Sequence, residues 1–221
     1  MFIVAGIIAT CATSCDNAGK KETSASVTTD TAMAMDNRKD TAMAEPSTPP
    51  LDSATMMKNW MAYSTPGPEH KMMASMNGTW SGEVTMYMEA GAPPQVSKAT
   101  MVNKMIMGGR YQQSNYSGNM MGMPFEGMSL MAYDNAKKKI LSTWVDNMGT
   151  GIMSMEGTWD STTHTITMSG KGIDPSAGTA KEHDMREIFR MIDNNNQVME
   201  MYGPDHQGRE YKMMEIKLTR K

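Results

Sequence analysis

A glutamate and a histidine stand side by side after two prolines, in the segment Pro66-Gly67-Pro68-Glu69-His70. A carboxylate beside an imidazole could serve acid–base catalysis or bind a metal ion. The competing interpretation is structural, because Glu69 would lie in the first turn of a helix, where the helix dipole stabilises negative charge. The histidines show no metal-binding spacing such as H-x-H or H-E-x-x-H. We therefore favour the structural role, and we expect no catalytic residue, metal or cofactor.

Three further sets combine polar and aromatic residues in stretches that alternate like β-strands. The sets are Arg110 with Tyr111, Trp144 with Asp146, and Arg186 with Glu200 and Tyr202. In a strand, residues two apart point to the same face, so Trp144 and Asp146 would lie together. If the face carrying such a set lines a barrel interior, it could hold the polar end of a ligand inside an apolar pocket. A buried salt bridge, or exposure on the outer face, is the alternative.

Methionine is the compositional outlier, with 30 residues against only four leucines. Thioethers bind Cu(I), and the densest cluster is where copper would bind. That cluster comprises Met120, Met121, Met123, Met128 and Met131. Exposed methionines could instead consume oxidants, because sulfoxide formation is reversible. Most methionines, however, occupy apolar positions in almost every expected element, and methionine fills core space well. We expect core packing to be their main role.

Charge and composition exclude several classes of protein. Lys and Arg number 21 and Asp and Glu 24, giving a net charge of -3, whereas a nucleic-acid-binding protein usually has a basic excess. No apolar run approaches the ~20 residues needed to span a bilayer, which excludes a polytopic membrane protein. The sequence contains no G-x-S-x-G motif, phosphate loop or dinucleotide fingerprint. These absences make an enzyme less probable than a binding protein.

The N-terminus has the pattern of an export signal. An apolar or small run from Phe2 to Ala12 has the length of a signal-peptide core. Ala12-Thr13-Ser14-Cys15 resembles a bacterial lipobox, and Ile8-Ala9-Thr10-Cys11 is a competing match. We prefer Cys15, because polar residues follow it at once. We therefore expect a signal peptide over 1–14, a lipid on Cys15 and anchoring to a membrane of the bacterial cell envelope.

Residues 15–51 form the expected tether behind the lipidated cysteine. The segment is rich in Ala, Thr, Ser, Asp and Lys, and it repeats Asp-Thr-Ala-Met-Ala at residues 30 and 40. It has too little apolar surface to offset the entropy of ordering, which predicts disorder. Residues 52–77 predict a helical lead-in. One helix would run from Ser53, which could cap it, to Tyr63, and another from Pro68 to Met76.

From Gly78 to Lys221 the apolar residues alternate with polar ones in short stretches separated by polar turns. Val84 and Met86 share one face of the first stretch, and Met101 and Met105 share one face of the second. About ten such strands at regular spacing predict an all-β fold, an antiparallel lipocalin/calycin-like barrel over 78–221. No strand–helix alternation is present, so a parallel α/β fold is not expected.

Two resemblances agree with this expectation. A short helix followed by Gly78-x-Trp80 is similar to the opening of lipocalin-type barrels, which implies that Trp80 plugs the closed end and that Gly78 is structural. From Trp60 to Lys221 the chain resembles the domain of unknown function 1579 family of uncharacterised bacterial lipoproteins. The motifs are Tyr63-x-x-Pro66-Gly67-x-Glu69-His70, Gly78-x-Trp80, Gly109-Arg110-Tyr111, Phe125-Glu126-Gly127, Tyr133-Asp134, Ser142-Thr143-Trp144-x-Asp146 and Met148-Gly149-Thr150. This resemblance implies a barrel and supplies no activity.

Our leading functional hypothesis is a barrel that binds a small apolar or amphipathic ligand, because an eight- to ten-stranded barrel can enclose such a molecule. The alternatives are an enzyme that uses the Glu69/His70 region, and a protein that handles copper or oxidants through methionine. The expected partners are that ligand and a membrane, reached through the lipid anchor, and nucleic acid is excluded.

Overall fold

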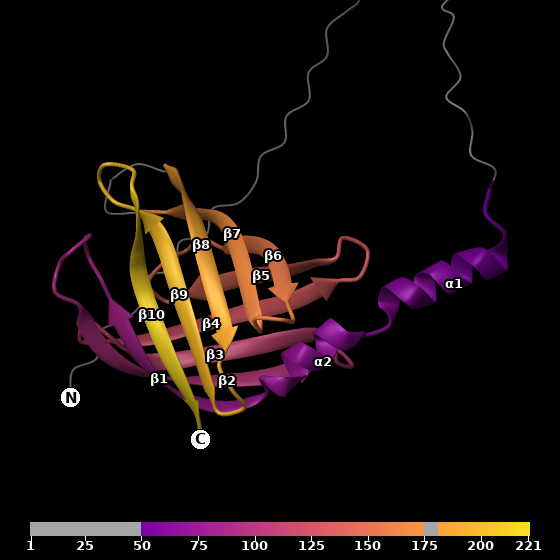
Figure 1. Cartoon of the computed structure of the whole chain (residues 1–221), viewed down its shortest axis with the longest axis horizontal. Helices are drawn as coiled ribbons and strands as arrows, with labels where there is room; N and C mark the ends of the chain where they lie inside the picture. Colours follow the sequence, from indigo (N-terminus) through magenta and orange to yellow (C-terminus); the bar gives the residue numbers. More distant parts are fainter. Residues whose placement is uncertain (1–49, 175–180) are drawn as a thin grey trace, which may run out of the picture. The chain divides into compact units, whose positions relative to one another are not determined.

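Ten antiparallel strands close into a barrel after a short helical lead-in, as the computed structural model shows (Figure 1). The strands are β1 (Gly78–Met86), β2 (Gln95–Ile106), β3 (Tyr111–Met120), β4 (Met123–Asp134), β5 (Lys139–Asp146), β6 (Met153–Asp160), β7 (Thr165–Ile173), β8 (Glu182–Met191), β9 (Asn196–Pro204) and β10 (Glu210–Arg220). Each strand pairs with its sequence neighbours, and β1 pairs with β10 to close the ring. The predicted fold class is confirmed.

The structure describes residues 50–174 and 181–221. The expected signal peptide, the lipidation site Cys15 and almost all of the tether lie outside the described residues. Residues from Pro50 to Lys221 form one compact unit.

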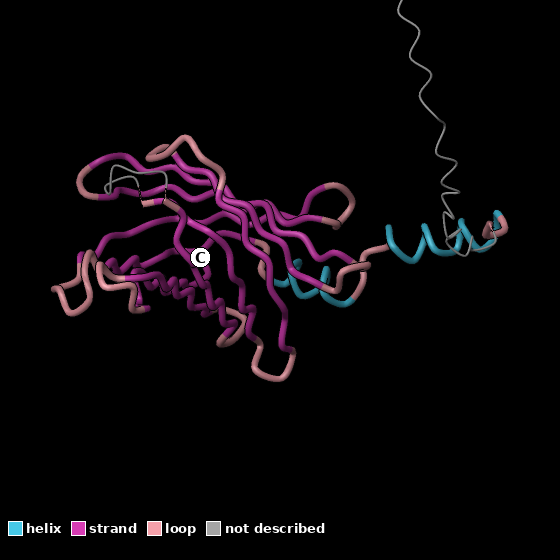
Figure 2. The backbone as a smooth tube through the Cα atoms, turned by 90° about the horizontal axis from the view of Figure 1, so that it is seen from above, coloured by secondary structure: helices cyan, strands magenta, loops and turns pink. Residues whose placement is uncertain are grey.

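Two helices precede the barrel, α1 (Ser53–Ser64) and α2 (Pro68–Ser75). Ser53 was the expected cap of α1, but the cap is Asp52, whose carboxylate accepts a hydrogen bond from the Thr55 backbone N–H. No side chain of α1 is buried, and Figure 2 shows α1 extending away from the strands while α2 lies beside them. α2 starts at Pro68, whose fixed φ and missing N–H suit a first helical position.

The strand register identifies the inward face of the barrel. Residues directly opposite each other in an antiparallel pair share a face. Met101 lies opposite Trp80, and Met168 lies opposite Gly157, and all four are buried. Every second residue from these positions therefore points into the barrel, and the residues between them point outward.

α2 closes one end of the barrel with methionine and hydrogen bonds. Met73 and Met76 are fully buried against Trp80, which is 0% exposed. The Trp80 indole N–H and the Asn103 side-chain amide each donate to the Met76 carbonyl at 3.0 Å. The side-chain amide of Gln112 donates to the Met73 carbonyl. The Met73 carbonyl also accepts the Met76 backbone N–H, but carbonyls at the end of a helix generally lack partners within the helix, so the barrel supplies donors to this end of α2.

Arg220, near the C-terminus, completes this closed end. Its guanidinium lies 4.2 Å from the centroid of the Trp80 ring and donates to the backbone carbonyls of Ser75, Asn77 and Asn194. Gly78 links α2 to β1 with a φ of 124°, and a Cβ there would lie 2.9 Å from an Arg220 nitrogen. Both its backbone conformation and the nearby guanidinium therefore require glycine.

Burial of the inward face falls from the α2 end towards the opposite end, which we call the mouth. On β10, Leu218 and Ile216 are buried and Met214 is partly exposed. On β7, Ile166 and Met168 are buried, whereas the glycines that follow are partly exposed. On β5, Ile140 is buried and the inward residues after it are partly exposed. β9 is the exception, because Gln197 at the α2 end and Gly203 at the mouth are both buried. The barrel is therefore packed solid near α2 and becomes accessible to solvent towards the mouth.

Trp80→Ala should lower the free energy of unfolding by about 3–5 kcal/mol, because it removes a fully buried indole and the hydrogen bond to the Met76 carbonyl. Trp60→Ala is the matched control, since Trp60 on α1 is 65% exposed and should cost less than about 0.5 kcal/mol. Chemical denaturation of both variants measures the difference. Equal losses would contradict the role of Trp80 as the plug of the closed end.

Candidate functional site

An aromatic wall lines the barrel interior near the mouth. Trp144 on β5 meets Tyr116 on β3 edge to face, with ring centroids 5.0 Å apart, and stacks with Phe125 on β4 at 6.2 Å. Gly127 lies between them on β4, and a Cβ at that position would be 2.5 Å from the Trp144 ring. The missing side chain therefore creates the space in which the indole lies flat against the wall. All three rings are partly exposed.

Asp146 faces inward with Trp144, but its carboxylate is already occupied. One oxygen accepts the Trp144 indole N–H at 2.6 Å. The other accepts the backbone N–H groups of Met148 and Gly149 at 2.9 and 3.1 Å. Asp146 therefore fixes the orientation of the indole and the turn after β5, and we assign it a positioning role rather than a ligand-binding one.

Glu187 on β8 is the unexpected acidic residue of the interior. It lies opposite Met168 on β7 and Met201 on β9, and it shares its face with Met185 and Phe189. Burial raises the pKa of its carboxyl group from 4.5 to about 7. No hydrogen bond or ion pair to its carboxylate is found among the described residues. Glu187 is nevertheless only partly buried by solvent accessibility, so molecules from solution can reach it.

Tyr116 faces Glu187 from the opposite wall. β3 and β8 lie five places apart in the ring of ten strands, which is as far apart as two strands can be. Burial raises the pKa of the Tyr116 hydroxyl, and the negative charge of Glu187 raises it further. The two groups therefore interact across the interior. We call Tyr116, Trp144, Glu187 and the adjoining methionines the lumen site.

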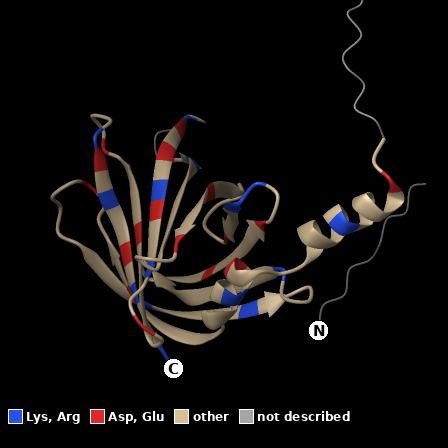
Figure 3. Cartoon of the chain, turned by 45° about the vertical axis from the view of Figure 1, so that its right-hand side comes forward, with Lys and Arg blue, Asp and Glu red and all other residues tan. Residues whose placement is uncertain are grey.

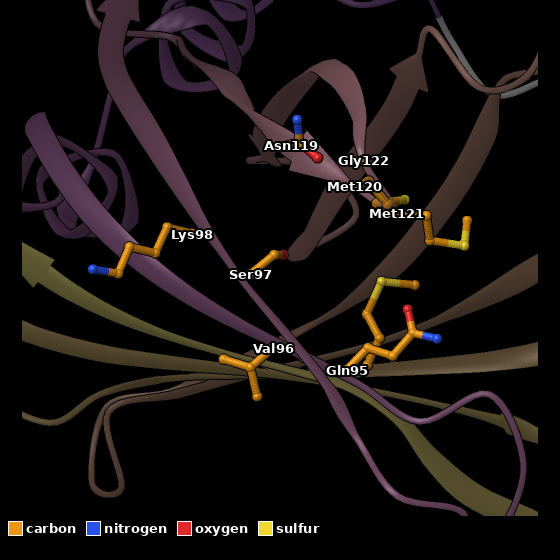
Figure 4. Close-up of a pocket in the computed structure, with 9 residues that line it drawn as sticks. Gln95, Val96, Ser97, Lys98, Asn119, Met120, Met121 and Gly122 are labelled. Atoms are coloured by element: carbon orange, nitrogen blue, oxygen red, sulfur yellow. The ribbon is translucent and has the colours of Figure 1, made fainter.

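The mouth is hollowed beside β1–β3. A depression of about 360 Å³ lies between the start of β2 and the β3–β4 turn. Its lining residues are Met86, Gln95, Val96, Ser97, Lys98, Asn119, Met120, Met121 and Gly122. Figure 4 shows Ser97 on the side of β2 that faces Met120 and Met121, with Lys98 directed the opposite way. The lining combines inward residues such as Ser97 with outward ones such as Lys98, and it includes none of the lumen-site residues, so this depression is a surface hollow at the rim of the mouth.

The Glu69/His70 pair lies at the closed end, where His70 has a structural role. The ring is buried, its Nδ1 accepts the Gly67 backbone N–H at 3.0 Å, and it meets Tyr133 edge to face at 5.9 Å. Burial lowers the pKa of His70, Glu69 opposes this effect and the Arg110 charge adds to it. Burial, followed by the charge and hydrogen bond of Glu69, raises the pKa of Tyr133. His70 thus forms part of the cap of α2, Glu69 lies in the first turn and contacts Tyr133, and Arg110 bonds the Met107 carbonyl at the neighbouring turn.

The remaining candidates lie on the outer face. Arg186 bonds both oxygens of Glu210, at 3.0 and 2.7 Å, and lies 4.1 Å from the centre of the Tyr202 ring. Glu200 accepts from Arg190 and Lys212. Burial alone would raise the pKa of Glu200, but these two hydrogen bonds lower it.

Tyr111 alternates with the inward Gln112 and therefore also points outward. Figure 3 shows acidic and basic residues interspersed along the strands rather than gathered into a patch of one sign.

The methionine cluster of the sequence is divided by the strand geometry. Met120 and Met121 line the hollow at the mouth. Met128 accepts from the Gln113 side chain outside the barrel, at 3.3 Å, whereas Met131 packs against the core. Met123 lies opposite Met120 across the β3–β4 turn. The five methionines of the alternative copper site are therefore not all brought together. In the described segments, no group of three or more His, Cys, Asp or Glu residues is placed to hold a metal ion.

The sequence patterns did not indicate three residues of the lumen as site residues: Tyr116, Phe125 and Glu187. A signal for Glu187 was present, because it alternates with Met185 and Phe189, two apolar residues on the same strand. The neighbouring Arg186 was chosen instead, on the opposite face. Tyr116 had a weaker signal, since the stretch Tyr111 to Ser117 is polar throughout and alternation does not separate its two faces.

Comparisons with known proteins agree with this architecture. A family model described as a protein of unknown function, DUF1579, matches residues 65–220, and the chain belongs to this family, as the motifs predicted. The chain is similar in structure to Rv2717c from M. tuberculosis, with 14% identity and a TM-score of 0.55, over 71% of this chain and 99% of that one. This likeness shows the barrel fold.

A second solved structure, a redesigned β-barrel, matches with 14% identity and a TM-score of 0.34, over 68% of this chain and 95% of that one. The comparison with curated proteins found no match. Within the described residues, neither helix has the length and apolar character required to cross a bilayer.

Glu187→Gln should stabilise the protein at pH 8 and leave it almost unchanged at pH 5. The folded-state pKa, about 7, exceeds the ordinary 4.5, so the folded protein holds the proton more tightly and loses stability as the pH rises through this window. The gain at pH 8 should be about 1–3 kcal/mol, measured by chemical denaturation at both values.

Glu83→Gln on the exposed outer face of β1 is the matched control and should show no pH-dependent gain. A Glu187→Gln effect of equal size at pH 5 and pH 8 would contradict burial of an ionisable carboxyl group.

Proposed function

We propose that this protein is a binding module that takes a small apolar or amphipathic ligand into its barrel through the mouth. The observation that carries the proposal is the gradient of burial along the inward face. Most inward side chains at the α2 end are buried, whereas the aromatic and methionine side chains near the mouth are partly exposed. Apolar side chains lining a concave and accessible surface are the usual form of a small-molecule site.

The methionines suit such a role. Methionine is unbranched and polarizable, so a wall of methionine can adapt to ligands of different shape. Met153, Met185, Met199 and Met214 lie on the inward face and are partly buried against the core. The enzyme alternative has less support, because His70 and Glu69 are engaged in capping α2 and contacting Tyr133. We therefore favour binding over catalysis.

We further propose that the protein is exported and held at a membrane of the bacterial cell envelope by a lipid on Cys15. α1 supports this placement. Met56, Trp60 and Tyr63 recur at helical spacing, Met57 and Met61 form the adjacent row, and all five side chains are exposed. Lys58 is the only charged residue of the helix. Such a helix suits the apolar boundary of a lipid surface.

A brominated alcohol, 10-bromo-1-decanol, tests the binding module, because bromine quenches the fluorescence of an indole it contacts. Saturable quenching is expected in the wild type, and unlabelled decanol should reverse it. Trp144→Phe keeps an aromatic ring in the wall and should abolish most of the quenching. Trp60→Phe, on exposed α1, is the matched control and should leave the quenching intact. Quenching that never saturates, or that survives in Trp144→Phe, would contradict binding at the lumen site.

Cys15→Ala should release the protein from membranes or leave it unprocessed, because the modified cysteine would be missing. Cys11→Ala should leave membrane attachment unchanged. Cell fractionation and mass spectrometry of the mature N-terminus measure both results. Acyl chains on Cys11, or on neither cysteine, would overturn the proposed anchor.

A further inference from the structure

The lumen site contains an acidic group without a partner in an otherwise apolar environment. Glu187 has methionines as its direct neighbours on both adjacent strands, Met168 and Met201, with Met185 two residues along its own strand. Thioether sulfur is a weak hydrogen-bond acceptor and cannot donate. Nothing in this immediate environment therefore supplies a hydrogen or a positive charge to the carboxylate.

The basic residues of the inward face do not pair with this charge. His183 lies on the same face of β8, four residues away towards the mouth, and no hydrogen bond or ion pair joins it to Glu187. Arg220 is the one Lys or Arg on the inward face of the described strands, and it lies at the closed end. There its guanidinium is stacked on Trp80 and bonded to three backbone carbonyls. The other inward acid, Asp146, already accepts hydrogen bonds from three N–H donors. The Glu187 carboxylate therefore has neither an ion-pair partner nor a hydrogen-bond donor, and a ligand could supply one.

The opposite wall also favours a positive charge. Tyr116, Trp144 and Phe125 form an aromatic cluster that faces the interior. The face of an aromatic ring attracts cations, and such rings form the cages that bind organic ammonium groups. The Tyr116 hydroxyl interacts with the charge of Glu187 across the interior. A ligand between the two walls would therefore contact an acid on one side and aromatic faces on the other.

From this arrangement we infer that the ligand class is a hydrophobic organic cation: an amphipathic amine whose ammonium group pairs with Glu187 while its apolar body contacts methionine and aromatic side chains. The inference rests on the proposed function, because it requires that the barrel admits a ligand. A metal cation suits the site less well, since one carboxylate among thioethers offers few of the oxygen ligands that hard ions require.

Displacement of 10-bromo-1-decanol at pH 8 tests the inference, with decylamine, decanol and decanoate as competitors of equal chain length. Decylamine, as its ammonium ion, should bind at least about tenfold more tightly than decanol, as expected for a hydrogen bond to a charged group in an apolar site. Decanoate should bind most weakly, because its charge repels that of Glu187. In Glu187→Gln the preference for decylamine over decanol should fall below about threefold, while decanol affinity is retained.

The matched control is Glu83→Gln, which removes an exposed acid from the outer face and should keep the full preference. Equal affinity for decylamine and decanol in the wild type, or a preference that persists in Glu187→Gln, would overturn the inference and leave the binding module standing. Preferential binding of decanoate would do the same. Failure of the bromodecanol and of all three competitors to bind saturably would overturn both proposals.

Discussion

The carbonyl groups at the end of α2 impose the constraint on which the rest of the structure depends. The last carbonyls of any helix need partners, and a helix end buried without them is costly. Here Trp80, Asn103, Gln112 and Arg220, from four different strands, donate to carbonyls between Met73 and Asn77. The barrel therefore closes around the helix end, and methionine fills the space beneath it. This arrangement fixes which end of the barrel is solid.

Because the α2 end of the barrel is closed and packed, the interior near the mouth is free to take a ligand. Buried polar and apolar groups concentrate near α2, so the opposite half of the interior is not needed to complete the core. Near the mouth, glycine takes the place of larger residues, and Trp144 lies against Gly127. Glu187 can remain without a partner there because it is not sealed from water. A carboxyl group fully enclosed among methionines would instead keep its proton and carry no charge.

The sequence predicted the fold better than the site, for a physical reason. Period-two alternation reveals that a stretch is a strand and which residues share a face, and every expected strand is present. Alternation alone does not say which face is inside when both faces carry polar residues, as in Met185-Arg186-Glu187-Ile188-Phe189. The register to β7 and β9 resolves that choice.

The candidates taken from alternation therefore had mixed outcomes. Trp144 and Asp146 lie on the inward face, whereas Arg186, Glu200 and Tyr202 point outward. The capping role of His70 depended on the backbone of Gly67, which spacing could only suggest.

The central claim is that the barrel is packed at α2 and accessible at the mouth, and methionine-methyl NMR tests it most directly. With ¹³C-labelled methionine methyl groups and a neutral, water-soluble gadolinium chelate, Met153, Met185, Met199 and Met214 should broaden first. The signals of Met73, Met76, Met101 and Met168 should remain sharp. Added decylamine should shift signals of the first group and leave the second in place. Uniform protection of both groups, with no shift on addition of decylamine, would contradict the account, because the barrel would then be filled throughout.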